Sequence, residues 1–328
     1  MKELYVQVRD RLLRRSRKLS DVFFAAAALM VIHVFAGSLV GMLVTKIPVI
    51  RNAMASLVYS ASMVEFLDNY LIFIGIWLVI LPIVIIFPAN RPMLKAIKYS
   101  HRGNNLKGFI FGILMGFGTN GLCVLLSWLS GDIKLSFYGF DFVVLLVFAV
   151  AVFIQSGAEE LADRFYLYQK LRRRYRHPLW AVLVNSLAFT LLHVGNPGFT
   201  LTAGIQIFLI GVVFSMMVYY YNNLWGAMAF HAAWNFTQNL IFGLPNSGIV
   251  SEYSIFALEA ASARDGLFYN VNFGVEGSVG ACALLAVIAV AIFVINRNRP
   301  EANDIWAESD RQTEEKESAA AEVSEAGE

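Results

Sequence analysis

Long apolar runs constrain the fold of this chain more than any other feature of its sequence. A helix that crosses a bilayer needs about 20 mostly apolar residues. Runs of this kind lie at about residues 22–45, 70–88, 108–129, 141–163, 179–196, 199–221, 224–243 and 279–296. The sequence therefore predicts an all-α, polytopic membrane protein with about eight transmembrane helices.

The composition agrees with a membrane protein and excludes several other classes. Hydrophobic residues make up 58% of the 328 residues, charged residues make up 15%, and the mean hydropathy is +0.59. Soluble domains average about 25% charged residues. A disordered chain, a collagen-like fibre and a disulfide-rich secreted domain are excluded. Because Cys123 and Cys282 lie in apolar runs, we predict neither a disulfide framework nor a cysteine-based zinc site.

The positive charges between the apolar runs predict how the chain is oriented. Cytoplasmic segments of membrane proteins are enriched in Lys and Arg. With eight spans, most basic residues fall on one face, in segments 1–20, 91–107, 170–176 and 297–316. We therefore predict a multi-pass protein of the cell membrane with both termini in the cytoplasm. The same charges are explained by topology, so no nucleic-acid partner is predicted.

The chain is predicted to have three parts. Residues 1–20 form a basic cytoplasmic N-terminus, and the apolar run behind it is long enough to be an uncleaved anchor. Residues 21–299 form a transmembrane helical domain. Residues 300–328 are rich in acids and poor in apolar residues, which predicts a disordered cytoplasmic tail. The loop at 244–278 is predicted to face outside, and its sequence indicates no function.

The fourth apolar run contains four charged residues. Glu160 and Arg164 are four residues apart, so they share a helix face and can form an ion pair. Glu159 points about 100° away from Glu160 and has no cation close by in the sequence. Asp163 lies on the face of Glu159. Charged groups within a span are expensive, and they usually mark functional sites.

Two later runs contain histidines. His193 lies in the fifth run, and His231 and Asn235 lie four residues apart in the seventh. Together with the carboxylates, these groups suit hydrolysis. A carboxylate can accept a proton from water, an imidazole can orient that water, and a His–Asn pair can donate to an oxyanion. Because His and Glu are common zinc ligands, the same residues could also hold a metal.

These motifs resemble the CPBP family, which comprises the CAAX proteases and bacteriocin-processing enzymes and includes type II CAAX prenyl endopeptidases. The resemblance lies in Glu159-Glu160-x-x-x-Arg164, Phe189-x-x-x-His193 and His231-x-x-x-Asn235, in this order and on separate helices. It places a catalytic core at about 140–243. Asp163-Arg164-Phe165 stands where the family often has Phe-Arg-Gly, so no substrate identity is carried over.

The resemblance implies an intramembrane endopeptidase that cuts a membrane-associated peptide or protein substrate, such as a CAAX-type or bacteriocin-like one. In the family, the first Glu and first His activate water, while the second His and the Asn stabilise the oxyanion. The second Glu and the Arg form a supporting pair. The catalytic residues implied here are Glu159, His193, His231 and Asn235, supported by Glu160 and Arg164.

The cofactor is left open by the sequence. The family is described both as metalloproteases and as metal-free enzymes in which a glutamate activates water. The two alternatives are therefore a divalent metal such as zinc, or no metal. If a metal binds, the expected ligands are Glu159, His193 and His231.

Two other functions remain alternatives at this stage. A protein of the same fold could be a non-catalytic membrane protein that binds a partner or gives immunity to a peptide toxin. All six motif residues are present, which favours the protease. A proton-coupled transporter would also use intramembrane carboxylates and histidines, but such proteins often contain internal repeats, and none is evident here.

Overall fold

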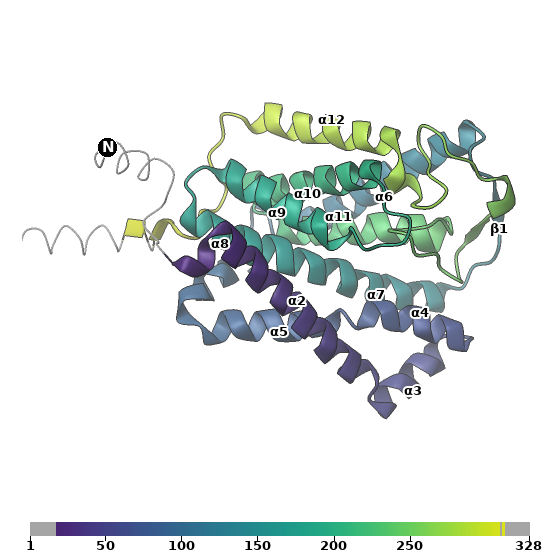
Figure 1. The fold of residues 1–328 in the computed structure, drawn as a ribbon, viewed down its shortest axis with the longest axis horizontal. Coiled ribbons are helices and arrows are strands. Elements are labelled where there is room, and N and C mark those ends of the chain that lie inside the picture. Colours follow the sequence, from purple (N-terminus) through teal and green to yellow (C-terminus); the bar gives the residue numbers. More distant parts are fainter. Residues whose placement is uncertain (1–17, 309, 312–328) are drawn as a thin grey trace, which may run out of the picture.

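The computed structural model describes residues 18–308, 310 and 311, and nearly all of its regular structure is helical (Figure 1). The main helices are α2 (Phe23–Thr45), α3 (Pro48–Leu57), α4 (Ala61–Leu71), α5 (Ile74–Ile86), α6 (Leu106–Leu129), α7 (Phe142–Glu160), α8 (Tyr168–Arg174), α9 (Pro178–Leu192), α10 (Leu201–Tyr221), α11 (Leu224–Phe236) and α12 (Val279–Asn296). The π-helices η3 (Leu161–Leu167) and η4 (Thr237–Ile241) continue α7 and α11. Short 3-10 helices are η1 (Leu19–Asp21), η2 (Pro88–Ala96), η5 (Ala260–Ser262) and η6 (Val275–Gly277), and β1 (Leu135–Phe137) pairs antiparallel with β2 (Phe256–Leu258).

The described residues contain six helices that are long and apolar enough to cross a membrane. They are Phe23–Thr45, Ala61–Ile86, Leu106–Leu129, Phe142–Arg174, Leu201–Tyr221 and Val279–Asn296. The other two predicted runs are also helical, as α9 and as α11 with η4, but α9 is short. The prediction of an all-α, multi-pass membrane protein is confirmed, and the exact number of eight spans stays a prediction.

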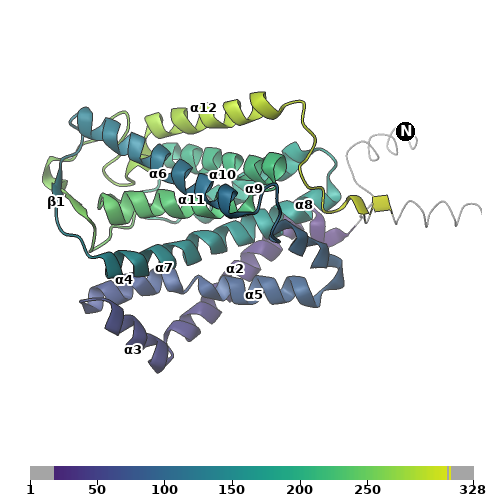
Figure 2. The same cartoon turned by 180° about the vertical axis from the view of Figure 1, so that it is seen from behind.

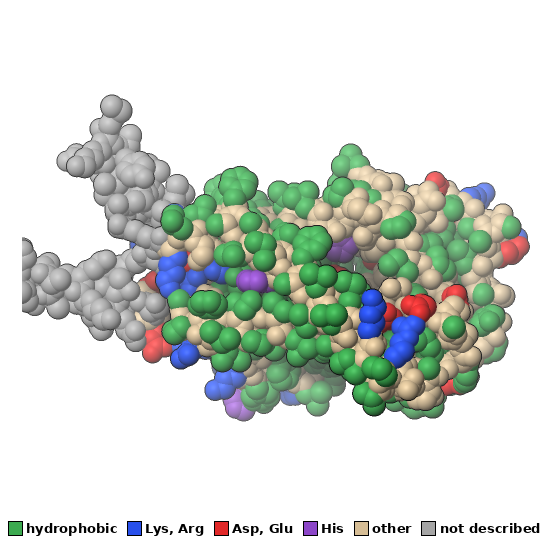
Figure 3. Space-filling view, turned by 60° about the horizontal axis from the view of Figure 1, so that its bottom comes forward, with side chains coloured by type: hydrophobic (Ala, Val, Ile, Leu, Met, Phe, Trp, Pro, Cys, Tyr) green, Lys and Arg blue, Asp and Glu red, His purple; other side chains and the backbone are tan. Residues whose placement is uncertain are grey.

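The helices pack in two groups on either side of α7. Figures 1 and 2 place α6, α9, α10, α11 and α12 on one side and α2 to α5 on the other. Apolar side chains cover much of the outer surface in Figure 3, and charged side chains gather toward the two ends of that face. This distribution fits a bundle surrounded by lipid.

The helix that begins at Phe142 continues well beyond the predicted fourth span. Its last turns contain Lys170 and Arg173, which were predicted to lie in a cytoplasmic loop but are buried in α8. Asp21 explains the difference, because it accepts hydrogen bonds from Lys170 Nζ at 3.2 Å and from Arg173 Nε at 2.5 Å. Burial alone would raise the pKa of Asp21, but Arg173 and Lys170 hold it below its ordinary value.

The beginning of the expected acidic tail packs on the bundle. Ile305 and Trp306 are buried, and Trp306 Nε1 donates to the carbonyl oxygen of Gln169 at 3.0 Å. Two apolar side chains therefore anchor this part of the segment 300–328. Residue 309, residues 312–328 of the expected tail and residues 1–17 of the basic N-terminus lie outside the described residues.

Two glycines allow α6 to pack closely against α11, the helix that carries His231 and Asn235. A Cβ atom on Gly112 would lie 2.1 Å from the carbonyl oxygen of Gly226, and one on Gly116 would lie 2.4 Å from that of Phe230. Both obstacles are backbone atoms, which cannot rotate away. Small residues four apart commonly permit this close approach between membrane helices.

Gly112→Ala should destabilise the protein, because the added methyl group forces α6 and α11 apart. Overpacking of this kind usually costs about 1–3 kcal/mol. The measurement is the midpoint of thermal unfolding of the purified protein in detergent. Gly118→Ala is the matched control, since a Cβ atom there meets nothing within 4 Å and the residue lies in the same helix. Equal midpoints for the two variants would contradict the prediction.

Candidate active site

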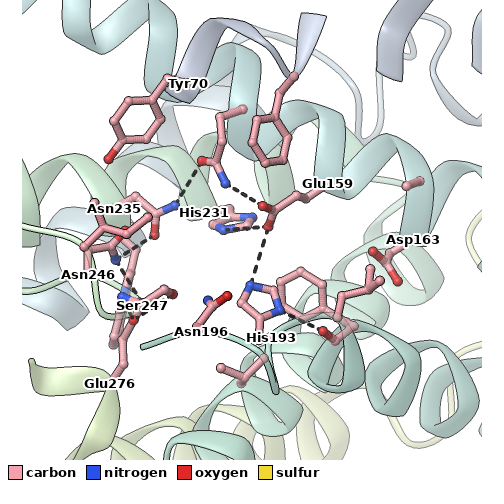
Figure 4. Close-up of a pocket in the computed structure, with 18 of the residues that line it drawn as sticks. Tyr70, Glu159, Asp163, His193, Asn196, His231, Asn235, Asn246, Ser247 and Glu276 are labelled. Carbon is pink, nitrogen blue, oxygen red and sulfur yellow. Dashed lines mark hydrogen bonds and ion pairs between the residues drawn. The ribbon is translucent and has the colours of Figure 1, made fainter. Parts of the chain in front are cut away.

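A cavity of about 350 Å³ is lined by side chains from α2, α4, α5, α7, α9, α10 and α11 and from the loop at 244–278. All four residues predicted to be catalytic line it: Glu159 lies in α7, His231 and Asn235 lie in α11, and His193 is the residue that directly follows α9. In Figure 4, the Glu159 carboxylate faces both His193 and His231, and Asn235 lies on the other side of His231. The fold therefore brings together Glu159, His193, His231 and Asn235.

Glu159 is held by one oxygen and presents the other to the histidines. Its Oε1 accepts a hydrogen bond from Gln155 Nε2 at 2.5 Å. Its Oε2 is buried, has no hydrogen-bond partner, and lies 3.9 Å from His193 Nε2 and 3.7 Å from His231 Nε2. These distances are too long for direct hydrogen bonds. One water molecule would bridge groups separated in this way.

The partners of the other ring nitrogens determine how the two imidazoles face Glu159. His193 Nδ1 lies 2.8 Å from the carbonyl oxygen of Phe189, and His231 Nδ1 lies 3.0 Å from Glu160 Oε1. Since a carbonyl or carboxylate oxygen can only accept, each Nδ1 carries the proton and donates. In the neutral form, each Nε2 therefore turns a lone pair toward Glu159. Glu159 Oε2 and the two Nε2 atoms are therefore three hydrogen-bond acceptors that face one another. A water molecule among them could donate its two protons to two of the three.

Glu160 and Arg164 form the ion pair that their spacing predicts. Arg164 Nη1 lies 3.0 Å from Glu160 Oε1, and both side chains are 0% exposed. The guanidinium also stacks over Phe189, with 4.4 Å between its carbon and the ring centroid. Glu160 Oε1 thus accepts from Arg164 and from His231, which ties α11 to the end of α7.

Asn235 already has partners at both ends of its side chain. Its Nδ2 donates to Gln155 Oε1 at 3.3 Å and to Ser156 Oγ at 3.2 Å. Its Oδ1 accepts from Asn246 Nδ2 at 3.2 Å. To donate to a substrate, the Asn235 amide must exchange one of these long contacts.

The comparisons with known proteins place most of this site within one family. Residues 141–237 match the model of the family described as type II CAAX prenyl endopeptidase Rce1-like. These residues form an Rce1-like domain. This match supports a CAAX-type intramembrane protease at the family level, in agreement with the CPBP resemblance. No curated protein and no solved structure matches the chain.

The Rce1-like domain does not contain the arrangement expected of a metal centre. Among residues 18–308, 310 and 311, no group of three or more His, Cys, Asp or Glu side chains forms a metal site. Glu159 Oε2 faces both imidazoles, at 3.9 Å from His193 Nε2 and 3.7 Å from His231 Nε2.

Asp163 and Gln155 each lie four residues from Glu159, and both line the cavity. Asp163 lines the cavity, as its position four residues after Glu159 predicts, and Asn185 Nδ2 donates to its backbone oxygen at 2.7 Å. Gln155 was missed, although it lies four residues before Glu159 and its spacing could have identified it. It bridges Glu159 and Asn235 and so belongs to the site.

A second group of site residues comes from outside the Rce1-like domain, in the loop at 244–278. Glu276 is buried and accepts hydrogen bonds from Trp234 Nε1 at 3.1 Å, Asn246 Nδ2 at 3.0 Å and Ser247 N at 2.7 Å. Ser247 Oγ donates a fourth, at 3.1 Å. Asn246 then donates to Asn235, as Figure 4 shows. One carboxylate therefore holds the start and the end of the loop against α11. No sequence pattern indicated these residues.

Glu276→Ala should release the loop at 244–278, because it leaves four donors without an acceptor. Each buried group left unsatisfied costs about 1–3 kcal/mol. The measurement is the rate of limited proteolysis within 244–278, with cut sites mapped by mass spectrometry. Glu259→Ala is the control, since Glu259 lies in the same loop but is exposed. Equal protection of the two variants would contradict the prediction.

Proposed function

We propose that this protein is an intramembrane endopeptidase that hydrolyses a peptide bond of a membrane-associated substrate, with Glu159 and His193 activating the attacking water. The observation that carries this proposal is the unpartnered Glu159 Oε2, which faces two imidazole nitrogens in a cavity inside the bundle. Glu160 Oε2 and Asp163 Oδ2 are also buried without a partner, but Glu159 Oε2 differs from them because it faces the Nε2 atoms of both His193 and His231.

The chemistry follows from the positions of these groups. A water between Glu159 and His193 donates one proton to Oε2 of the carboxylate and the other to Nε2 of the imidazole. As its oxygen attacks the carbonyl carbon, Glu159 takes the first proton and the carbonyl oxygen becomes negative. When the intermediate collapses, the C–N bond breaks and Glu159 returns that proton to the leaving amine. Gln155 holds the carboxylate in place throughout.

The oxyanion requires donors, and His231 and Asn235 are the nearest candidates. His231 can donate from Nε2 only when both of its nitrogens carry protons. Glu159 and Glu160 flank the ring and supply the counter-charge for that form. Asn235 can donate after releasing Ser156 or Gln155, so substrate entry would exchange one hydrogen bond for another.

The wall of the cavity indicates the character of the substrate. Opposite the polar groups, apolar side chains from α4, α5 and α10 line the cavity, among them Phe66, Ile76, Ile207 and Ile210. These residues suit an apolar segment next to the scissile bond. A CAAX-type or bacteriocin-like peptide has such a segment, and we propose this class of membrane-associated peptide as substrate.

Glu159→Gln should abolish peptide cleavage while the protein stays folded, because the amide keeps the shape of the carboxylate but cannot take the proton. Loss of a general base typically lowers the rate by about 10²–10⁴. The assay compares purified wild type and variant in liposomes against a library of membrane-associated peptides, with products identified by mass spectrometry. His193→Ala should fall to a similar level.

Glu65→Gln serves as the control, since Glu65 is an exposed carboxylate in α4. A fully active Glu159→Gln variant would refute the role of Glu159 in water activation. Each assay is run with and without a chelator, which tests metal dependence separately from that role. If folded wild type cleaves no member of the library, the outcome counts for the partner-binding or immunity alternative.

Arg164→Ala should lower the amount of folded protein as well as activity, because it leaves Glu160 charged and buried without its partner. Breaking a buried pair from one side costs about 3–5 kcal/mol. Size-exclusion chromatography and thermal unfolding measure the effect. The double variant Glu160→Gln/Arg164→Met removes both charges and keeps an acceptor for His231, so it should recover folded protein. A double variant no better than Arg164→Ala would contradict this account.

A further inference from the structure

A second cavity lies away from the catalytic residues. It is a groove of about 980 Å³ between α6, α10 and α12, here called the α6–α12 groove. Figures 1 and 2 show these three helices side by side on the side of α7 opposite α2. None of the residues assigned a role in peptide hydrolysis lines it. The groove is therefore a separate feature of the bundle.

Positive charge gathers at one end of the α6–α12 groove. Arg102 and Lys107 flank the start of α6, and Arg299 follows the end of α12. These ends lie together, because Ala302 N donates to the carbonyl oxygen of Tyr219 near the end of α10. All three cations are exposed, and none forms an ion pair with a carboxylate of the described residues. The acid at this rim, Glu301, instead pairs with Arg172.

The rest of the α6–α12 groove is apolar and runs into the depth of the bundle. Met115 lies eight residues after Lys107, which is about 12 Å along a helix. The walls at this depth come from all three helices and from the middle of α11, through Phe111, Met115, Val213, Met217, Phe230, Ile288 and Ile292. Tyr220 and Tyr221 lie nearer the charged end, at the position where tyrosines commonly meet the membrane interface.

We propose that the α6–α12 groove binds one anionic phospholipid of the surrounding membrane, with its phosphate among Arg102, Lys107 and Arg299 and an acyl chain along α6, α10 and α12. Charge complementarity decides the class of ligand. Three cations at one end of an apolar groove match a negative headgroup that is joined to a hydrocarbon chain. A zwitterionic lipid or a soluble phosphate would satisfy only one of these two parts.

The test uses the full chain in nanodiscs that contain phosphatidylcholine with or without phosphatidylglycerol of the same acyl chains. Native mass spectrometry of the protein released from the discs counts the lipids that stay bound. We expect wild type to retain one phosphatidylglycerol in preference to phosphatidylcholine. The triple variant Arg102→Gln/Lys107→Gln/Arg299→Gln should lower that retention by about tenfold or more, because each cation near the headgroup contributes to binding.

Arg91→Gln/Lys98→Gln/Arg297→Gln is the matched control. It removes the same amount of charge from exposed residues that do not line the groove. Ala291→Trp tests the apolar part, since this exposed groove residue can fill the path of the acyl chain. It should lower retention while all three cations remain.

Equal retention of the two lipids by wild type would overturn the proposal. So would an equal loss in the groove variant and its matched control, which would mean general attraction to a charged surface. Displacement of the bound lipid by soluble glycerol phosphate would show that the acyl chain contributes nothing, and the lipid assignment would be wrong. Peptide cleavage is not a readout here, so failure of this proposal leaves the proposed protease function to its own assay.

Discussion

The site depends on one buried acceptor, Glu160 Oε1. It accepts one hydrogen bond from Arg164 on its own helix and another from His231 on α11. The first contact neutralises a charge that the bundle could not otherwise bury, and the second fixes which nitrogen of His231 faces the cavity. Glu159, the preceding residue, makes neither of these contacts, and its Oε2 faces the cavity without a hydrogen-bond partner. Two adjacent glutamates thus have different environments, because they point to different sides of the same helix. Glu160 pairs with Arg164 and His231 through Oε1, whereas Glu159 faces the cavity.

Close packing extends this arrangement to the other helices. Gly112 and Gly116 let α6 approach the backbone of α11, and Gly226 lies at that contact. On the opposite end of α11, Glu276 binds Trp234 and, through Asn246, reaches Asn235. The helix with the second histidine is therefore held from three directions, and one of them is a loop outside the Rce1-like domain. A preorganised site needs this kind of support, because a misplaced donor gives little stabilisation to a transition state.

Helical periodicity explains which parts were predictable. The apolar runs overlapped all six long helices, although the run at 70–88 missed the first part of Ala61–Ile86. Four-residue spacing identified the Glu160–Arg164 pair and placed Asp163 on the face of Glu159. Lys170 and Arg173 were misplaced, because basic residues are usually a loop signal and only the distant Asp21 makes their burial possible. Glu276 and Asn246 could not be identified, since a long irregular loop has no period that tells which of its residues turn inward. The burial of Ile305 and Trp306 was not predicted either, because they lie in an acidic segment that has no apolar period.

The two cavities share α10 as a wall. Ile207 and Ile210, in its first half, line the catalytic cavity, whereas Val213 and Met217, further along, line the α6–α12 groove. Next to Val213, Phe214 stacks on His231 with ring centroids 5.6 Å apart. Buried apolar contacts on both sides of a helix resist its displacement, because close-packed interiors transmit strain. An acyl chain in the α6–α12 groove would therefore stabilise the part of α10 that contains Phe214 and contacts His231. Its effect should fall on the stability of the bundle more than on the chemical step, since no group in the groove reaches the cavity that holds Glu159.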